Sequence, residues 1–411
     1  MKTRILAWCA LACALALPSL APGQEKTPYE EAVDVFVAGK GNPYKSIRIP
    51  CIICPDGKTL VAAAEGRYVA TDQGKNDIIV SISKNGGKTW SAPAVAAKAN
   101  GATFNNPYLI YDKDTKEYIL FFQSYPPGVR ERGDIPAGSS DPKTLRNFVC
   151  FSKNAKNWSK PKDVTATTKH EDCTITCSGP NPGVQISRGA HQGRLVVVFN
   201  EAVKFGKWHL TAAYSDDHGK TWNLGEKSQD DMGVNEVSVV ETEAGGIFVV
   251  SRNHGGPGGG VKRVAYSEDA GETWSSVTAH SQLPCVGCQN GLTRYSFAID
   301  ETRGGKSRIL FSGPAGPGRQ NGVIKLSYDE GLTWNVSKSV GKGPFMYSTL
   351  CPMEGGNVGL LFEKSDKVIS FTHFSLEWLT DGDDNYFSAS SGSTAKGKKE
   401  KKRKGAKSDN E

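Results

Sequence analysis

The chain has 411 residues and a formal charge of +7 at pH 7, with 23% charged and 38% hydrophobic residues. These proportions are those of a globular protein and exclude a chain that is disordered throughout. Glycine accounts for 46 residues, which favours an all-β protein rich in turns.

The positive charge lies at the two ends of the chain. Residues 1–23 carry +2 and residues 390–411 carry +5, whereas residues 24–389 contain 40 bases and 40 acids. A neutral body gives no reason to expect nucleic acid as a partner. Beyond the N-terminus no apolar run approaches the roughly 20 residues of a membrane span, so we expect no transmembrane segment.

Residues 1–23 are typical of a secretory signal peptide. Lys2 and Arg4 form a basic start, Ile5 to Leu17 is an apolar stretch, and Ser19-Leu20-Ala21 offers a cleavage site between small residues. The stretch is short for an anchor helix and is followed by prolines, so we expect export to the periplasm or the medium. At the other end, residues 390–411 are rich in Ser, Gly and Lys and predict a solvated tail, with binding to an acidic polymer as the alternative.

Between these ends a short signature recurs about every sixty residues. Its copies are Ser83–Trp90, the shortened Ser152–Trp158, Ser215–Trp222, Ser267–Trp274 and Ser327–Trp334. Most copies carry Asp two residues after the Ser, then Gly, and end on Trp. Asp accepts backbone N–H groups in tight turns, Gly permits a positive φ, and Trp packs back over a hairpin. Strand-like stretches precede the copies, so the pattern predicts an array of β units that is typical of a β-propeller.

Eight cysteines remain once Cys9 and Cys13 leave with the signal peptide. They include two Cys-x-x-Cys pairs, Cys51/Cys54 and Cys285/Cys288. These pairs lie about 230 residues apart, too far for a zinc ribbon, so we expect disulfides or buried thiols without a metal. The sequence leaves their pairing open.

The repeated signature resembles the Asp box, or bacterial neuraminidase repeat, of the sialidase family. The resemblance covers residues 43–379 and implies an all-β fold, a six-bladed β-propeller of four-stranded antiparallel blades within residues 24–389. Two boxes depart from the pattern by carrying Asn in place of Asp.

The chemistry of a sialidase requires arginines, because only the guanidinium fork suits the carboxylate that sits on the anomeric carbon of sialic acid. Such enzymes use a tyrosine nucleophile rather than a second carboxylate. By resemblance, Asp72 is the acid/base, Glu236 activates the nucleophile Tyr347, and the substrate-binding arginines are Arg48, Arg67, Arg252 and Arg319, with Arg263 a competitor for the place of Arg252.

These residues predict an exo-α-sialidase that releases terminal α-linked sialic acid, with retention, from glycoproteins, glycolipids and oligosaccharides. No cofactor is expected, and the scattered histidines suggest no metal site. The alternatives are a sialic-acid-binding lectin or adhesion propeller without turnover, and a related exo-glycosidase or trans-sialidase acting on another nonulosonic acid.

Overall fold

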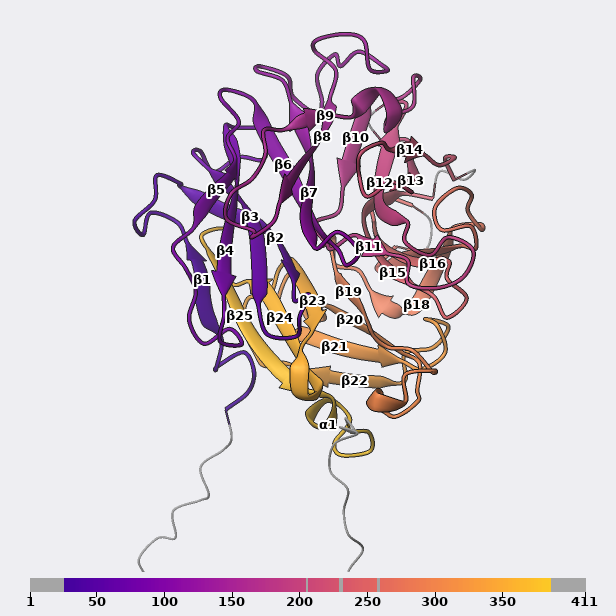
Figure 1. Ribbon diagram of the computed structural model, residues 1–411. Coiled ribbons are helices and arrows are strands. Elements are labelled where there is room, and N and C mark those ends of the chain that lie inside the picture. The colour runs from indigo at the N-terminus through magenta and orange to yellow at the C-terminus, as the bar shows by residue number, and fades with distance from the viewer. Residues whose placement is uncertain (1–25, 205, 229–231, 257–258, 386–411) are drawn as a thin grey trace, which may run out of the picture.

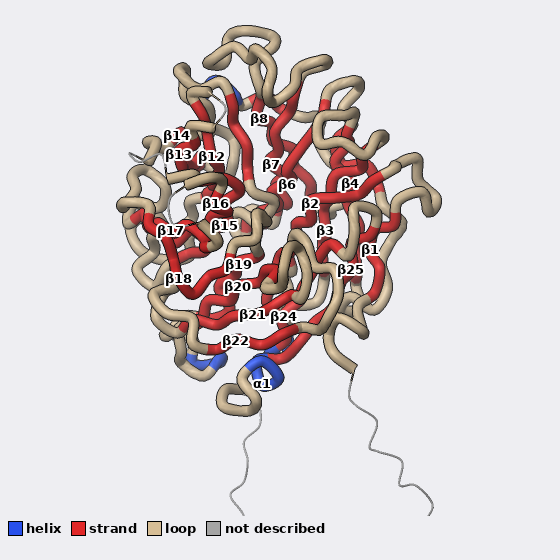
Figure 2. The backbone as a smooth tube through the Cα atoms, turned by 180° about the vertical axis from the view of Figure 1, so that it is seen from behind, coloured by secondary structure: helices blue, strands red, loops and turns tan. Residues whose placement is uncertain are grey.

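The computed structural model describes residues 26–204, 206–228, 232–256 and 259–385, so the predicted signal peptide and basic tail lie outside the described residues. Strands and loops make up nearly all of this part of the chain (Figure 2). The helical elements are α1 (Leu376–Leu379) and three single 3-10 turns at Thr165–Thr167, Glu301–Arg303 and Glu354–Gly356. Within the described ranges, no helix combines the length and apolarity that crossing a membrane would need.

Hydrogen bonds group the strands into five sheets. Three sheets have four strands each. The first contains β1 (Val33–Val37), β25 (Val368–Ser375), β24 (Asn357–Glu363) and β23 (Ser348–Pro352). The second contains β15 (Val234–Glu241), β16 (Ile247–Asn253), β17 (Val261–Ser267) and β18 (Thr278–Pro284), and the third contains β19 (Gly291–Ser296), β20 (Arg308–Pro314), β21 (Gly322–Ser327) and β22 (Val336–Ser339). A five-stranded sheet contains β10 (Ile175–Ser178), β11 (Val184–Gln185), β12 (Leu195–Ala202), β13 (Trp208–Ser215) and β14 (Asn223–Leu224). An eight-stranded sheet contains β2 (Ser46–Ile53), β3 (Leu60–Arg67), β4 (Asn76–Ser83), β5 (Ala94–Ala97), β6 (Thr103–Asp112), β7 (Glu117–Tyr125), β8 (Arg146–Ser152) and β9 (Lys162–Asp163).

The all-β propeller class is confirmed, but six separate four-stranded sheets are not found. The eight-stranded sheet arises because one parallel pair, Asn76 with Thr103, joins β4 to β6, while the other strand pairs in this sheet are antiparallel. The fifth strand of the β12 sheet is the two-residue β11, which pairs with one end of β12. Both departures are local backbone pairings, which the turn motifs in the sequence do not predict.

The sheets follow one another in chain order around a central axis (Figure 1). Innermost strands of neighbouring units touch one another around that axis, β2 with β6 and β23, and β19 with β15 and β23. The ring closes where β1, from the start of the described chain, pairs with β25, from its end. This pairing places the two ends of the described chain in one sheet and so holds the ring together.

The Asp boxes form hairpin turns, as predicted. In Ser215–Trp222, Asp217 Oδ1 accepts the Thr221 N–H at 2.9 Å, Ser215 Oγ accepts the Gly219 N–H at 2.8 Å, and the indole of Trp222 donates to the Gly219 carbonyl at 3.1 Å. Asn85 accepts the corresponding N–H in its own box at 3.0 Å, so Asn serves in place of Asp there. Each of the five boxes connects the third and fourth strands of a unit.

Three innermost strands carry a β-bulge near the same mouth of the propeller. The register shifts lie between Arg48 and Cys51 in β2, Asn105 and Tyr108 in β6, and Val234 and Val237 in β15. Bulges re-aim side chains and are common beside active sites. In β2 the bulge places Ile49 at φ 66°, a strained conformation for a β-branched residue.

Candidate active site

A cavity of about 280 Å3 opens at this mouth, and all seven predicted site residues line it. Their side chains come from β2, β3, β15 and β16 and from the loops that carry Asp72, Arg319 and Tyr347. The first and the last of them in the sequence, Arg48 and Tyr347, are about 300 residues apart, so only ring closure brings them together. Arg263, the competitor for the place of Arg252, does not line this cavity.

Arg48 is held by a carboxylate that the sequence analysis did not single out. Glu363, at the end of β24, is completely buried, and its Oε1 accepts the Arg48 Nε–H at 2.7 Å and the Ile49 N–H at 2.7 Å. Its Oε2 accepts the Tyr347 N–H at 3.3 Å. One carboxylate therefore ties the strained bulge of β2 to the backbone of Tyr347.

Tyr347 and Glu236 form a buried pair in the cavity. The Tyr347 hydroxyl donates a hydrogen bond to Glu236 Oε1, and Tyr347 is 4% and Glu236 8% exposed. Arg252 Nη1 donates to Glu236 Oε2 at 3.0 Å and to the Tyr347 hydroxyl oxygen at 3.2 Å. The three side chains thus form one hydrogen-bonded unit that contains both a phenol and its proton acceptor.

Burial and the Glu236 charge raise the pKa of Tyr347 well above its usual value, although Arg252 and Arg319 oppose the shift. The resting site therefore holds a neutral phenol whose hydroxyl is hydrogen-bonded to Glu236. Two guanidinium groups also lie over the Tyr347 ring, Arg48 at 5.3 Å and Arg319 at 5.2 Å from its centroid.

Asp72 lies at the rim of the cavity. Its side chain is 77% exposed, and its Oδ1 accepts a hydrogen bond from Arg67 Nη1 at 2.6 Å. The rest of the Arg67 guanidinium binds Glu65, a completely buried carboxylate that also accepts the Asn106 N–H at 2.8 Å. Glu65 therefore holds Arg67, and Arg67 in turn positions the exposed Asp72.

Other lining residues were missed by the sequence analysis. They include Asn105, Tyr125, Glu131, Arg132, Trp208 and His254. Glu131 is a further acid in the lining of the cavity, and burial and the charge of Asp72 raise its pKa. The signal for Glu363 and Glu65 was present, since each ends or interrupts an apolar strand and a lone acid in such a strand requires a buried partner. The bulges and loops that bring in the other six gave no such signal.

Among the described residues, the one cluster with metal-ligand chemistry is Asp112, Asp114 and His218, which stands outside this cavity. Asp112 already accepts hydrogen bonds from the Asp114 N–H at 2.9 Å and from His218. These contacts account for the cluster as turn structure.

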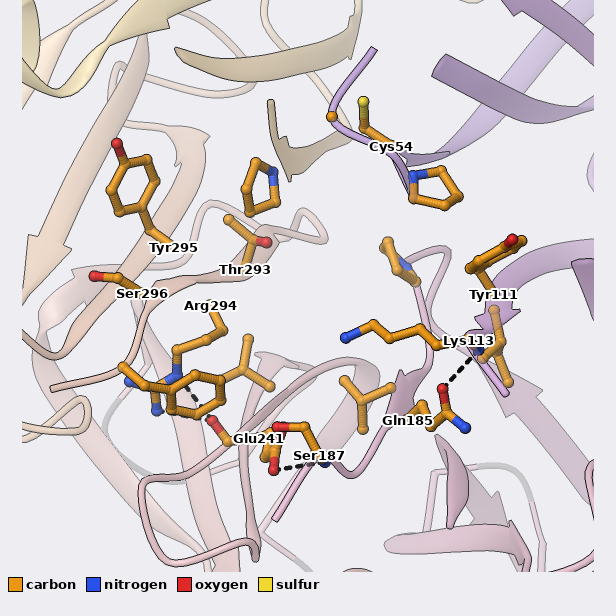
Figure 3. A pocket seen from close by; sticks show the side chains of 18 of the residues that line it. Cys54, Tyr111, Lys113, Gln185, Ser187, Glu241, Thr293, Arg294, Tyr295 and Ser296 are labelled. Carbon is orange, nitrogen blue, oxygen red and sulfur yellow. Dashed lines mark hydrogen bonds between the residues drawn. The ribbon is translucent and has the colours of Figure 1, made fainter. Parts of the chain in front are cut away.

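A second cavity, of about 700 Å3, lies at the opposite ends of the same inner strands (Figure 3). Lys113 extends toward its centre, and Ser187 donates to Glu241 on its wall at 2.8 Å. None of the seven predicted residues lines it, and the four predicted arginines and the Tyr347–Glu236 pair are all at the other mouth.

The fold and cavity define an Asp-box β-propeller with an arginine-lined, acid-bearing site. The family model described as BNR repeat-like domain matches residues 58–360, and the chain belongs to this family. The chain is 30% identical over 378 residues to a sialidase of Micromonospora viridifaciens, covering 89% of this chain and 56% of that protein. It is 25% identical to an anhydrosialidase of Macrobdella decora, covering 86% of this chain and 63% of that protein.

These alignments span only about three fifths of the relatives' own length. Among solved structures, a Hadza microbial sialidase superposes with a TM-score of 0.74 at 24% identity, covering 85% of this chain and 69% of that one. The intramolecular trans-sialidase from Ruminococcus gnavus, in complex with oseltamivir carboxylate, superposes with a TM-score of 0.73 at 22% identity, covering 84% and 98%. At these identities the superpositions support the propeller fold itself.

Proposed function

We propose that this protein is an exo-α-sialidase that hydrolyses terminal α-linked sialic acid from sialylated glycans with retention of configuration. The observation that carries the proposal is the convergence of three arginines on a buried Tyr347–Glu236 pair in one cavity. The sialidases among its relatives support the same substrate class.

Arg48, Arg252 and Arg319 supply the cations for the sugar carboxylate. Arg48 and Arg252 are already anchored by Glu363 and Glu236, so their guanidinium groups lose little freedom when substrate binds. Charge-assisted hydrogen bonds from these groups orient the anomeric carbon and remain in place as positive charge develops on the ring.

Tyr347 is the proposed nucleophile. Its oxygen attacks the anomeric carbon while its proton passes to Glu236, the acceptor it already contacts. A free phenol ionises only near pH 10, and burial raises this pKa further, so attack depends on that proton transfer. Arg252 lies within hydrogen-bonding distance of both oxygens and stabilises either location of the negative charge.

Asp72 is the proposed acid/base. Its position at the rim, in contact with Arg67 and with most of the side chain exposed, suits a group that protonates the departing glycosidic oxygen and later deprotonates water. Deglycosylation of Tyr347 by that water completes hydrolysis and retains the configuration.

The test is turnover of a fluorogenic aryl sialoside by Tyr347→Phe, with Tyr118→Phe as the matched control because the Tyr118 ring packs against Tyr111 outside the cavity. We expect a loss of about 10³-fold or more for Tyr347→Phe, as for removal of a nucleophile, and wild-type turnover for the control. Wild-type turnover by Tyr347→Phe would refute the assigned role.

Two other functions share this site. A sialic-acid-binding lectin would bind a dehydrated sialic acid analogue without turnover, and it has no use for a buried Tyr–Glu pair. Transfer rather than hydrolysis is the nearer alternative, because the relatives include an anhydrosialidase and the solved structures include an intramolecular trans-sialidase. Mass analysis of the released sugar decides, since free sialic acid supports hydrolysis and an anhydro product supports intramolecular transfer.

We also infer that the propeller has six blades, with the eight-stranded sheet counted as two. A single parallel pair joins its halves, β2 to β5 and β6 to β9. Six apolar clusters support this division, since each packs between two units that are neighbours in the ring. An experimental structure with β4 and β6 paired along their length would contradict it.

A further inference from the structure

The Cys285–Cys288 segment forms a tight turn directly beneath the candidate active site. It links β18 to β19, and the Cys285 N–H donates to the Gly260 carbonyl at 2.8 Å. Gly287 has φ +66°, which lets the chain reverse within the motif. The N–H groups of Gly287, Cys288 and Asn253 all point to Cys285 Sγ, the last at 3.4 Å.

A buried lysine faces this sulfur. Lys262 is 1% exposed, and its ammonium donates to the Cys288 carbonyl and interacts electrostatically with Cys285. Burial opposes ionisation of Cys285, yet Lys262 and the three N–H groups outweigh burial, and the pKa of Cys285 falls below its ordinary value. For Cys288, burial raises the pKa to about 12. The two thiols of one turn are therefore unequal.

The turn also supports two residues of the site. The Gly287 carbonyl accepts the Arg319 Nη2–H at 2.9 Å, and Cys288 packs with Ile49 and Tyr347 in one apolar cluster. Any change in the geometry of the turn is therefore transmitted to a substrate-binding arginine and to the proposed nucleophile.

We propose that Cys285 and Cys288 are a thiol modification site, at which a reversible disulfide changes how the turn holds Arg319. Cys285 is the attacking thiol because it is the more ionised and, at 7% against 1%, the more exposed of the two. The oxidant is a small disulfide of the glutathione class. Cys285 attacks one of its sulfurs and releases a thiolate; Cys288 then loses its proton, attacks Cys285 Sγ and releases the second thiolate. The protein loses two protons and two electrons, and the oxidant is reduced to two thiols.

The other Cys-x-x-Cys pair is a control within the same chain. Cys51 lies in β2 and Cys54 directly follows that strand. Residues three apart along a strand are separated by about 10 Å, whereas the Cα atoms of a disulfide must lie within about 7 Å. Burial raises the pKa of each of these thiols to about 12. We therefore expect no cross-link between Cys51 and Cys54.

The first arm of the test equilibrates the full-length protein in glutathione buffers from fully reducing to fully oxidising and maps its peptides without reduction. We expect a Cys285–Cys288 cross-link that lacks two hydrogens and reverses on reduction, none between Cys51 and Cys54, and slower formation in Lys262→Met. Absence of the Cys285–Cys288 cross-link at every ratio in the folded protein overturns the proposal. So does an unchanged rate in Lys262→Met, with circular dichroism confirming that this variant folds.

The second arm rests on the proposed function and compares KM and kcat of the oxidised and reduced protein on a small sialoside. Gly287, whose carbonyl accepts the Arg319 Nη2–H, lies between the two cysteines in the chain. We therefore expect the disulfide to weaken this contact and KM to rise by about tenfold, the size of one charge-assisted hydrogen bond, with kcat changing less. Cys285→Ser should show the same KM in both buffers. A cross-link with unchanged KM overturns the link to Arg319. A cross-link in a protein without turnover refutes the sialidase function and leaves the modification site standing, because the peptide map does not depend on activity.

Discussion

Replacement of Glu363 by Gln isolates the role of the buried carboxylate at the base of the site. The substitution keeps the size of the side chain and removes its charge. Glu363 is completely buried and binds three groups: the Arg48 guanidinium, the Ile49 N–H of the strained bulge and the Tyr347 N–H. Because the Arg48 side chain is only 13% exposed, water replaces the lost counter-charge poorly.

Breaking one partner of a buried ion pair costs about 3–5 kcal/mol, and the partial exposure of Arg48 favours the lower figure. The amide can still accept one or two of the hydrogen bonds, so we expect a loss of about 3 kcal/mol in the free energy of unfolding. At about 2 °C for each kcal/mol in a chain of this size, the melting temperature should fall by about 6 °C. KM for a sialoside should also rise, because Arg48 is no longer fixed.

The assay is differential scanning calorimetry of Glu363→Gln beside Glu354→Gln. Glu354 is the matched control, since it pairs with Lys58 at 3.2 Å on the surface and its side chain is 58% exposed. Such a pair is worth about 0–1 kcal/mol, so the control should melt within about 2 °C of the wild type. Equal melting temperatures for the two variants would show that Glu363 does not stabilise Arg48 as its contacts indicate.

Two further predictions concern the scaffold. Asp217→Ala should lower the free energy of unfolding by about 1–2 kcal/mol, because a turn N–H and a threonine hydroxyl lose their acceptor. Asp217→Asn should lower it less, since Asn85 and Asn154 accept the corresponding N–H groups in other boxes. Equal losses for the two variants in urea titrations would contradict this. Burial lowers the pKa of Lys169 to about 8, against about 10.4 in the unfolded chain, so its neutral form is favoured by folding. The unfolded state then binds more protons between these values, and wild-type stability should rise from about pH 8 to pH 10.4 relative to Lys169→Met. If the free energies of unfolding of the two proteins changed with pH in parallel, burial would not disfavour the charged form of Lys169.

Much of this protein was readable from residues close together in the chain. The turn bonds of an Asp box lie within about seven residues, as in Ser215–Trp222, so the turn follows from the local sequence. In four of the five boxes the Trp indole also donates to a carbonyl of its own box, whereas that of Trp274 donates to Glu226. The predicted site residues were identified in the same way, from short motifs around Arg48, Arg252 and Tyr347, and the structure brings all of them to one cavity.

What the motifs did not contain are the contacts between separate segments of the chain. Glu363 meets Arg48 across more than 300 residues, and the bulges that aim the inner strands depend on pairing with partners such as β3 and β16. The same is true of the sheet count, which one bond pattern between β4 and β6 reduces from six to five. From the sequence, Cys285 and Cys288 were expected to be disulfide-bonded or buried thiols of unknown pairing, and only the tertiary structure places Lys262 and Arg319 against this turn. The geometry of a turn is determined by groups that are close in the sequence. The charges around a buried carboxylate or thiol come instead from other strands, which become its neighbours only in the folded propeller.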